Sequence, residues 1–190
     1  MTQQNYRGLY INNKINIFWF RRDLRLEDNV GLYNCSQSDI SFLPIFIFDK
    51  AILAKLKDKD DARVSFIYNT VLDLKSTLQS HGSDLRVYFG KTEDIFNEIF
   101  KEFDVESVYS NEDYEPLAIR RDSKIKKLCS INKINFLQTK DQCIFSKNDI
   151  LKNDGKPYTV YTPYKNKWLS TLEPKDIVTV SFKKSKEKLF

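Results

Sequence analysis

The stretch IFWFRRDLRLEDN, residues 17–29, decides the fold of this chain. It belongs to a continuous apolar run, residues 15–20, which is typical of a strand covered on both faces. The run changes at once to charge at Arg21, Arg22 and Asp23, followed by leucines that alternate with charged residues. Strands covered on both faces belong to parallel sheets, which bind ligands beyond the carboxyl ends of their strands. The charged cluster therefore marks a ligand-binding rim or, more simply, a solvated network of ion pairs that orders the turn.

Strand and helix patterns alternate over the next 120 residues. Four further apolar stretches are predicted to be strands, at residues 42–48, 85–89, 105–109 and 134–137. Helices are expected between them, at about residues 24–37, 60–80, 92–103 and 116–132. Pro44 is unusual inside the second stretch and indicates a strand start or a sheet edge. Since parallel strands need crossovers, we predict an α/β fold with a doubly wound, five-stranded parallel sheet, Rossmann-like, and helices on both faces.

The segment 60–80 has the clearest helical pattern. Its apolar residues recur at spacings of three and four, which places them on one face: Val64, Ile67, Val71, Leu74 and Leu78. Asp60 and Asp61 are candidates for the N-cap, and Gly82 is expected to end the helix.

The net charge of +5 lies entirely in the last quarter of the chain. Residues 147–190 contain ten lysines and five acidic residues, whereas basic and acidic residues balance in residues 1–146. A basic tail on a neutral domain suits a phosphate-rich partner, and a solubilising tail explains the same charge equally well.

We predict three parts along the chain, with different compositions. They are a loose N-terminus at 1–13, an α/β domain at 14–145 and a loop-rich basic linker at 146–190. Within the linker, turns are expected at residues 153–155 and at Pro163, and no packed element is expected at residues 181–190.

The chain offers little for catalysis by its own side chains. Neither the GxGxxG nor the GxxxxGK[ST] phosphate-binding pattern occurs. The one histidine, His81, lies at a predicted helix end, and Cys35, Cys129 and Cys143 lack zinc-site spacing. We therefore assign no catalytic residue and no metal site, and expect any chemistry to come from a cofactor. Free cysteines, without a signal sequence or a membrane-length apolar run, predict a cytoplasmic protein without membrane contact.

Five motifs that follow one another along the chain carry a specific resemblance. They are WFRRDLRLEDN (19–29), PIFIFD (44–49), DDARVSFI (60–67), NEDYEPLAIRRD (111–122) and DGKPYTVYTPYKNKW (154–168). In this order they resemble the N-terminal α/β domain of the photolyase/cryptochrome family, and most closely that of a bacterial cyclobutane pyrimidine dimer photolyase. The resemblance covers roughly residues 15–170.

The resemblance implies a light-driven repair function for the whole protein. The N-terminal domain would hold an antenna chromophore. A helical C-terminal domain, which is missing here, would bind FAD and split flipped-out pyrimidine dimers in UV-damaged DNA by electron transfer from excited reduced FAD. We therefore expect a photolyase that continues past Phe190 and whose N-terminal part is inactive alone. The alternatives are a cryptochrome-type blue-light receptor domain and a stand-alone module that binds a small ligand or nucleotide.

The same resemblance places the antenna chromophore near seven residues of the rim: Arg21, Phe48, Asp49, Arg63, Phe66, Asn111 and Asp113. Arginine and asparagine would donate hydrogen bonds, aspartate would accept them and phenylalanine would form an apolar wall. Two of these residues have competing structural roles, since Arg63 could pair with Asp60 and Phe66 could belong to the core.

The chromophore would be a deazaflavin, a flavin or a folate, or the pocket could be empty. Leu117 and Ala118 stand where some folate-binding members of the family have an Asn-Glu pair, which weakens the case for a folate of that type.

The stretch YTPYKNKW contains the candidate DNA contacts. Lys165 and Lys167 would touch DNA phosphates. The neighbouring aromatic residues are expected to pack this segment onto the sheet and the missing helical domain: Tyr158, Tyr161, Tyr164 and Trp168.

Overall fold

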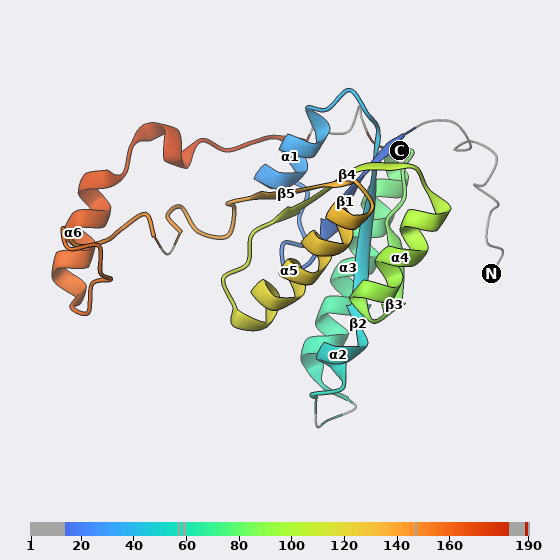
Figure 1. The fold of residues 1–190 in the computed structure, drawn as a ribbon, viewed down its shortest axis with the longest axis horizontal. Coiled ribbons are helices and arrows are strands. Elements are labelled where there is room, and N and C mark those ends of the chain that lie inside the picture. Colours follow the sequence, from blue (N-terminus) through green and yellow to red (C-terminus); the bar gives the residue numbers. More distant parts are fainter. Residues whose placement is uncertain (1–13, 57, 59, 147, 183–188, 190) are drawn as a thin grey trace.

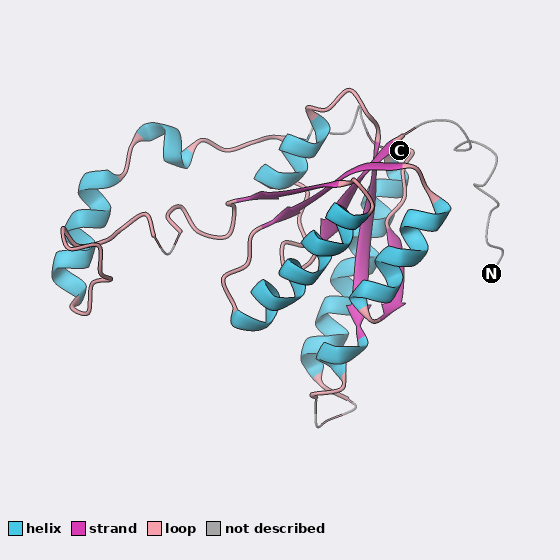
Figure 2. Ribbon diagram, viewed as in Figure 1, coloured by secondary structure: helices cyan, strands magenta, loops and turns pink. Residues whose placement is uncertain are grey.

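Five parallel strands form one sheet, in the order β3-β2-β1-β4-β5, in the computed structural model of the chain. The strands are β1 (Ile15–Phe20), β2 (Phe42–Asp49), β3 (Arg86–Gly90), β4 (Val105–Asn111) and β5 (Asn135–Thr139). The structure describes residues 14–56, 58, 60–146, 148–182 and 189, so the predicted loose N-terminus lies outside the described residues. The predicted doubly wound, five-stranded parallel sheet is confirmed (Figure 2).

Helices cover both faces of this sheet. They are α1 (Val30–Ser36), α2 (Lys50–Leu53), α3 (Ala62–Ser80), α4 (Thr92–Glu102) and α5 (Pro116–Ile131). Figure 1 shows α4 and α5 in front of the sheet and α3 behind it. Alternate side chains of β1 enter the two cores, because successive residues of a strand point to opposite faces. Ile17 and Trp19 pack with α4 and α5, whereas Phe18 and Phe20 pack with α1 and α3, which explains the continuous apolar run.

Helix α3 begins and ends as predicted, but only its second half is packed. The Asp61 carboxylate accepts a hydrogen bond from the Arg63 backbone N–H at 2.9 Å, and Gly82 takes a positive φ of 80° after the last turn. The 19 residues of α3 span about 28 Å, whereas the five residues of β3 span about 17 Å. The first turns of α3 therefore extend past that strand, and Ile67, predicted to be on the buried face, is exposed.

Pro44 is the third residue of β2, which begins at Phe42. It pairs with Phe18 of β1, and β3 pairs with β2 only from Ile45 onward. The missing N–H of Pro44 therefore interrupts no hydrogen bond to β3. Of the two predictions for this proline, the strand start is wrong, and the sheet edge holds only locally, because β2 as a whole lies between β1 and β3.

The segment after residue 146 contains a helix where loops were predicted. Helix α6 spans Tyr161–Thr171, and a 3-10 helix, η2, spans Pro174–Ile177. Pro163 lies in the first turn of α6, where proline is tolerated because the first N–H groups of a helix have no partner within it. The prediction of a turn at Pro163 is therefore wrong. Figure 1 shows α6 at the left, away from the sheet.

The chain then returns to the sheet, contrary to the prediction for residues 181–190. The Asp28 backbone N–H donates to the Val180 carbonyl at 2.9 Å, and the Phe182 N–H donates to the Glu27 carboxylate at 3.1 Å. The Phe182 side chain is buried in the core below α3, and Leu189 bridges to Phe42. Within the described residues, no helix is both long and apolar enough to cross a membrane.

Substitution of Phe182 tests this closing contact. We expect Phe182→Ala to lower the free energy of unfolding by about 3 kcal/mol, because it removes a buried ring and leaves a cavity. The matched control is Val178→Ala, since Val178 is exposed on the same segment and should change stability by less than about 0.5 kcal/mol. Urea unfolding monitored by circular dichroism measures both; equal, small effects would mean that the segment does not pack on the sheet.

Candidate functional site

Asn111, the last residue of β4, ties together three segments at the rim. Its side chain is buried, and its Oδ1 accepts a hydrogen bond from the Gly31 backbone N–H at 2.9 Å. Its amide nitrogen donates to Asp23 and to Asn29, which uses both of its N–H bonds. A Cβ atom on Gly31 would lie 2.2 Å from Oδ1 of Asn111. The amide therefore fixes the turn after β1 and the start of α1 against β4.

Arg21 forms a buried ion pair beneath α5. Its guanidinium donates to the Asp122 carboxylate at 2.5 Å, and only about one twentieth of each side chain is exposed. Gln138 donates to the same carboxylate at 2.9 Å. The guanidinium groups of Arg21 and Arg121 lie 5.2 and 4.8 Å from the Trp19 ring centroid, within the range of cation–π attraction. Burial, and then repulsion from Arg21, lower the pKa of Arg121.

The other arginines of the opening motif reach across the rim. Arg22 pairs with Glu115 at 2.7 Å and lies 3.7 Å from the Asp113 carboxylate. Arg25 pairs at 2.8 Å with Asp141, whose side chain is almost completely buried. The charges behind β1 therefore connect it to the segments after β4 and β5. The ion-pair interpretation of this motif expected the pairs within the turn itself, whereas the partners lie on distant segments.

At the end of β2, the Asp49 carboxylate is also engaged. It accepts hydrogen bonds from the Thr92 hydroxyl at 2.6 Å and from the Ala51 backbone N–H at 2.8 Å. The preceding residue, Phe48, is half-buried, and its ring centroid lies 6.4 Å from that of Tyr68 on α3. At this end of the sheet, the Asp49 carboxylate is thus held by two hydrogen bonds and the Phe48 ring is partly exposed.

Arg63 and Phe66 project from the unpacked first turns of α3. Arg63 pairs with Asp61 at 2.5 Å, whereas the predicted alternative was Asp60. This hydrogen bond lowers the pKa of Asp61 to about 2. Phe66 is 71% exposed, so the alternative that it belongs to the core is wrong. Residues three apart share a helix flank, so the cation and the ring stand side by side.

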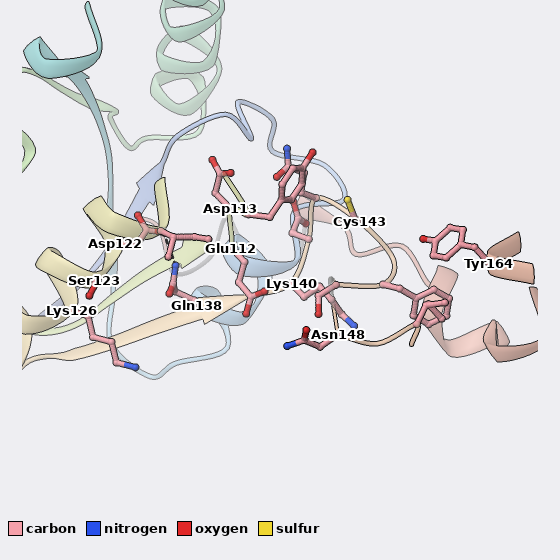
Figure 3. A pocket seen from close by; sticks show the side chains of 17 residues that line it. Glu112, Asp113, Asp122, Ser123, Lys126, Gln138, Lys140, Cys143, Asn148 and Tyr164 are labelled. Carbon is pink, nitrogen blue, oxygen red and sulfur yellow. Dashed lines mark hydrogen bonds between the residues drawn. The ribbon is translucent and has the colours of Figure 1, made fainter. Parts of the chain in front are cut away.

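Two cavities open at the rim. The larger, about 810 Å³, lies between α5, the end of β5, the loop that follows and α6 (Figure 3). Its lining residues are Glu112, Asp113, Tyr114, Ile119, Asp122, Ser123, Lys126, Gln138, Lys140, Asp141, Gln142, Cys143, Phe145, Ser146, Asn148, Ile150 and Tyr164. The smaller, about 80 Å³, lies over the motif after β1. The larger volume is within the range of small-molecule sites.

The predicted site residues divide between these places. Arg21, Asn111 and Asp113 line the small cavity, and Asp113 also borders the large one. The other four, all within the described residues, line neither cavity: Phe48, Asp49, Arg63 and Phe66. The polar groups at the rim are thus bonded to one another or to neighbouring segments, whereas Arg63 and Phe66 are exposed on one flank of α3.

Sequence reasoning missed Gln138, Asp141 and Asp122. Gln138 and Asp141 lie at and just beyond the end of β5. Ligands bind beyond the carboxyl ends of the strands of such a sheet, and this rule had been applied only to the first four strands. Applied to the fifth strand, it predicts both residues. Asp122 was quoted within a motif, but a helix position gives no sign of a buried partner 101 residues away.

The polar side chains at the rim are suited to binding a ligand, and two of the cysteines are buried in the core. Burial raises the pKa of Cys129 to about 12 and that of Cys35 well above its usual value, so neither thiol ionises readily. Among the described residues, no cluster of three or more histidine, cysteine or acidic side chains is arranged to hold a metal ion. Helix α3 exposes the aromatic side chains of Phe66 and Tyr68 on opposite flanks, and Arg63, which is paired with Asp61, lies on the Phe66 flank.

Comparison with known proteins assigns the chain to a family. The sequence model of the family described as DNA photolyase matches residues 16–182, most of the chain. The chain belongs to the DNA photolyase family. A deoxyribodipyrimidine photo-lyase of Synechococcus is 31% identical over 86% of this chain and 34% of its own length. Cryptochrome-1 of Aedes aegypti is 28% identical over 74% of this chain and 27% of its own length.

A solved structure agrees in fold. The archaeal photolyase of Sulfolobus tokodaii is 35% identical, with a TM-score of 0.69 over 84% of this chain and 35% of that one. The chain thus spans about a third of the photolyases that it matches and corresponds to their N-terminal part. In this family that part binds an antenna chromophore, and the C-terminal part binds FAD.

A double-mutant cycle tests the tie made by Asn111. We expect Asn111→Ala to cost about 2 kcal/mol of stability, because the Gly31 N–H is left buried without its partner. Gly31→Ala should cost about 1–3 kcal/mol, because its new methyl group meets the Asn111 oxygen.

In the Asn111→Ala background the same methyl group no longer clashes, so the second cost should fall by about 1 kcal/mol or more. Denaturant unfolding of the four proteins measures this coupling. Simple additivity of the two costs would contradict the contact.

Proposed function

We propose that this chain is the light-harvesting domain of a DNA photolyase and holds a flavin-type antenna chromophore at the α3 side of the rim. The observation that carries the proposal is the exposed pair Arg63 and Phe66 on one flank of α3, in a member of this family. When bound, the chromophore would absorb light and pass the excitation energy to FAD. The protein's part is to bind the ring, orient it and shield it from water.

The seven predicted site residues take two roles in this proposal. Phe48 and Phe66 form the apolar wall, and Arg63 is the accessible hydrogen-bond donor. The other four hold the rim in shape, because their polar groups have partners on other segments of the protein: Arg21, Asp49, Asn111 and Asp113. The partner of Arg63, by contrast, is Asp61 at the start of its own helix, and the Arg63 side chain is exposed. A ligand that took those bonds would have to replace them at comparable strength.

The proposed chromophore class is a flavin or a deazaflavin. Leu117 and Ala118 occupy the positions of the Asn-Glu pair of some folate-binding relatives, and Ala118 is buried. The Sulfolobus tokodaii photolyase, 35% identical to this chain, was solved with two FAD molecules, which imply a novel light-harvesting cofactor in that protein. An apolar and aromatic surface with one cation suits a flat tricyclic ring.

Fluorescence titration tests both the class and the place. We expect saturable binding of FAD, FMN or a deazaflavin by the 190-residue chain, and weaker binding of a methenyl folate. Phe66→Ala and Arg63→Ala should each weaken binding about tenfold, which corresponds to about 1.4 kcal/mol. Both side chains are exposed, so neither change should affect folding.

The matched control is Tyr114→Ala, which removes an exposed aromatic side chain from the large cavity. It should leave binding unchanged. Loss of binding in this control alone would move the chromophore to the large cavity, and absence of saturable binding by any of the flavins would contradict the proposal.

The whole protein's activity is proposed from the family. We propose that it splits cyclobutane pyrimidine dimers in UV-damaged DNA as a cytoplasmic enzyme, with residues 14–145 as the antenna domain and residues 146–190 leading toward a helical FAD domain. Helix α6, all of whose residues are described, has no buried residue, and the apolar side chains of Val160, Leu169 and Val178 are exposed around it. Apolar side chains gathered on one segment in this way are typical of a surface that another domain covers.

Within this segment we propose Lys165 and Lys167 as contacts to DNA phosphate. Both are exposed on α6. The aromatic residues have other neighbours, since Trp168 lies edge-on to Phe145 at 5.3 Å and Tyr164 lies 6.2 Å from Tyr158. The aromatic contacts hold the helix, and the lysines face solvent.

Salt dependence of DNA binding tests the lysines. Each phosphate contact contributes about 0.9 to the slope of log K against log salt concentration, so Lys165→Ala/Lys167→Ala should reduce the slope by roughly 2. The matched control is Lys101→Ala/Lys127→Ala, which removes the same charge from α4 and α5. Equal reductions in both variants, or no binding of a UV-irradiated duplex, would argue against a specific contact.

A further inference from the structure

Two guanidinium groups lie over the indole ring of Trp19. The Trp19 side chain is buried, and its ring packs edge-on against Phe96 with 5.0 Å between the centroids. The guanidinium carbon of Arg21 lies 5.2 Å from the indole centroid, and that of Arg121 lies 4.8 Å from it. Two like charges beside one buried ring repel each other, so packing alone does not favour this arrangement.

A single carboxylate is bonded to both cations. Asp122 on α5 accepts a hydrogen bond from Arg21 at 2.5 Å through one oxygen and from Arg121 at 3.1 Å through the other. The Asp113 carboxylate also acts on Arg121, but it lies 3.7 Å from the Arg22 guanidinium and is shared with that cation. The group of side chains next to the indole therefore contains two positive charges and one fully committed negative charge.

An excess of positive charge at this distance changes the redox chemistry of the ring. An indole that loses an electron becomes a radical cation, and nearby cations oppose the new positive charge, most strongly where water does not screen them. The neutral indole, by contrast, attracts the guanidinium groups through the negative face of its π system. Both effects favour the neutral, reduced form of Trp19.

Trp19 is also close to the rim. It is the next-to-last residue of β1 and precedes Arg21 by two residues, which is about 7 Å along an extended chain. The other tryptophan, Trp168, lies on α6. Light-excited flavins take electrons from indoles that are near them, and the excitation energy is then lost. Trp19 is therefore the tryptophan of the chain from which a chromophore at the rim would take an electron.

We propose that Arg21 and Arg121 protect Trp19 from oxidation by an excited chromophore at the rim. In the reaction that they suppress, one electron passes from the indole to the excited flavin; the indole is oxidised to a radical cation, and the flavin is reduced by one electron. Because this reaction is suppressed, the excitation energy remains available for transfer to FAD. This role rests on the proposed function, whereas the resistance of Trp19 to oxidation is a property of the chain alone.

Photo-oxidation in the absence of flavin tests that property. Illumination of a ruthenium tris(bipyridine) complex with persulfate generates a one-electron oxidant, and mass spectrometry of peptides measures oxidised Trp19, with Trp168 as the reference within the same chain. Arg121→Gln removes the charge and should raise the oxidation of Trp19 relative to Trp168 at least about fivefold.

Two further variants separate charge from shielding by bulk. Arg121→Lys keeps the charge and should leave the oxidation of Trp19 close to that of the wild type. Arg120→Gln removes an exposed arginine from the neighbouring position of α5 and should have no effect. Equal increases in Arg121→Gln and Arg121→Lys, or no increase in Arg121→Gln, would overturn the proposal. Circular dichroism of each variant confirms that it is folded.

The fluorescence lifetime of bound flavin tests the role in the proposed function. Arg121→Gln should shorten the lifetime, and Trp19→Phe in the same background should restore it, because phenylalanine is a much poorer electron donor than tryptophan. Trp19→Phe alone should leave the lifetime unchanged; a longer lifetime would show that the indole already quenches the flavin and would overturn the proposed role. If no flavin binds, the proposed function fails, and the photo-oxidation measurement still decides whether the two arginines protect Trp19.

Discussion

The Asn111 side chain is the interaction on which the rim of this protein depends. One buried amide bonds to the turn after β1, to Asn29 and to the backbone of α1, so the end of β4 anchors a segment about 80 residues earlier in the sequence. Gly31 leaves the space that this contact needs. The Arg21–Asp122 pair fixes the opposite face of the same strand ends. Breaking a buried pair of this kind costs about 3–5 kcal/mol, so the rim is rigid where the polar groups meet.

The residues that keep the rim rigid are different from those that remain accessible to a ligand. The polar groups at the ends of β1, β2 and β4 already have partners within the protein. The charged cluster follows the buried strand β1 because its charges connect this strand end to the segments after β4 and β5. The groups left accessible are on α3, where Phe66 and Arg63 extend beyond the packed part of the helix. Because its second half is packed against the sheet, α3 presents these side chains from a fixed position, as a preorganised chromophore site requires.

The sequence predicted much of this architecture, for physical reasons. The apolar run of β1, the Asp61 cap and the Gly82 terminus are local signals, and each appeared where expected. The exposure of Ile67 was not predictable, because periodicity shows which residues share a face and not how far the sheet extends below them. Helix α6 was missed because its polar composition, with Pro163 in the first turn, resembles a loop. The hydrogen bonds and ion pairs of the polar groups at the rim join residues up to 116 positions apart. No local sequence pattern indicates such pairs.

The most direct test of the account is to locate the bound chromophore by NMR. Titration of the isotope-labelled chain with the tightest-binding flavin should shift backbone amide signals at the end of β2 and in the first two turns of α3, around Phe48, Arg63 and Phe66. Signals from the large cavity, such as those of Tyr114 and Phe145, should remain unchanged. Shifts confined to that cavity, or no saturable shifts at all, would contradict the central claim that α3 presents the antenna site.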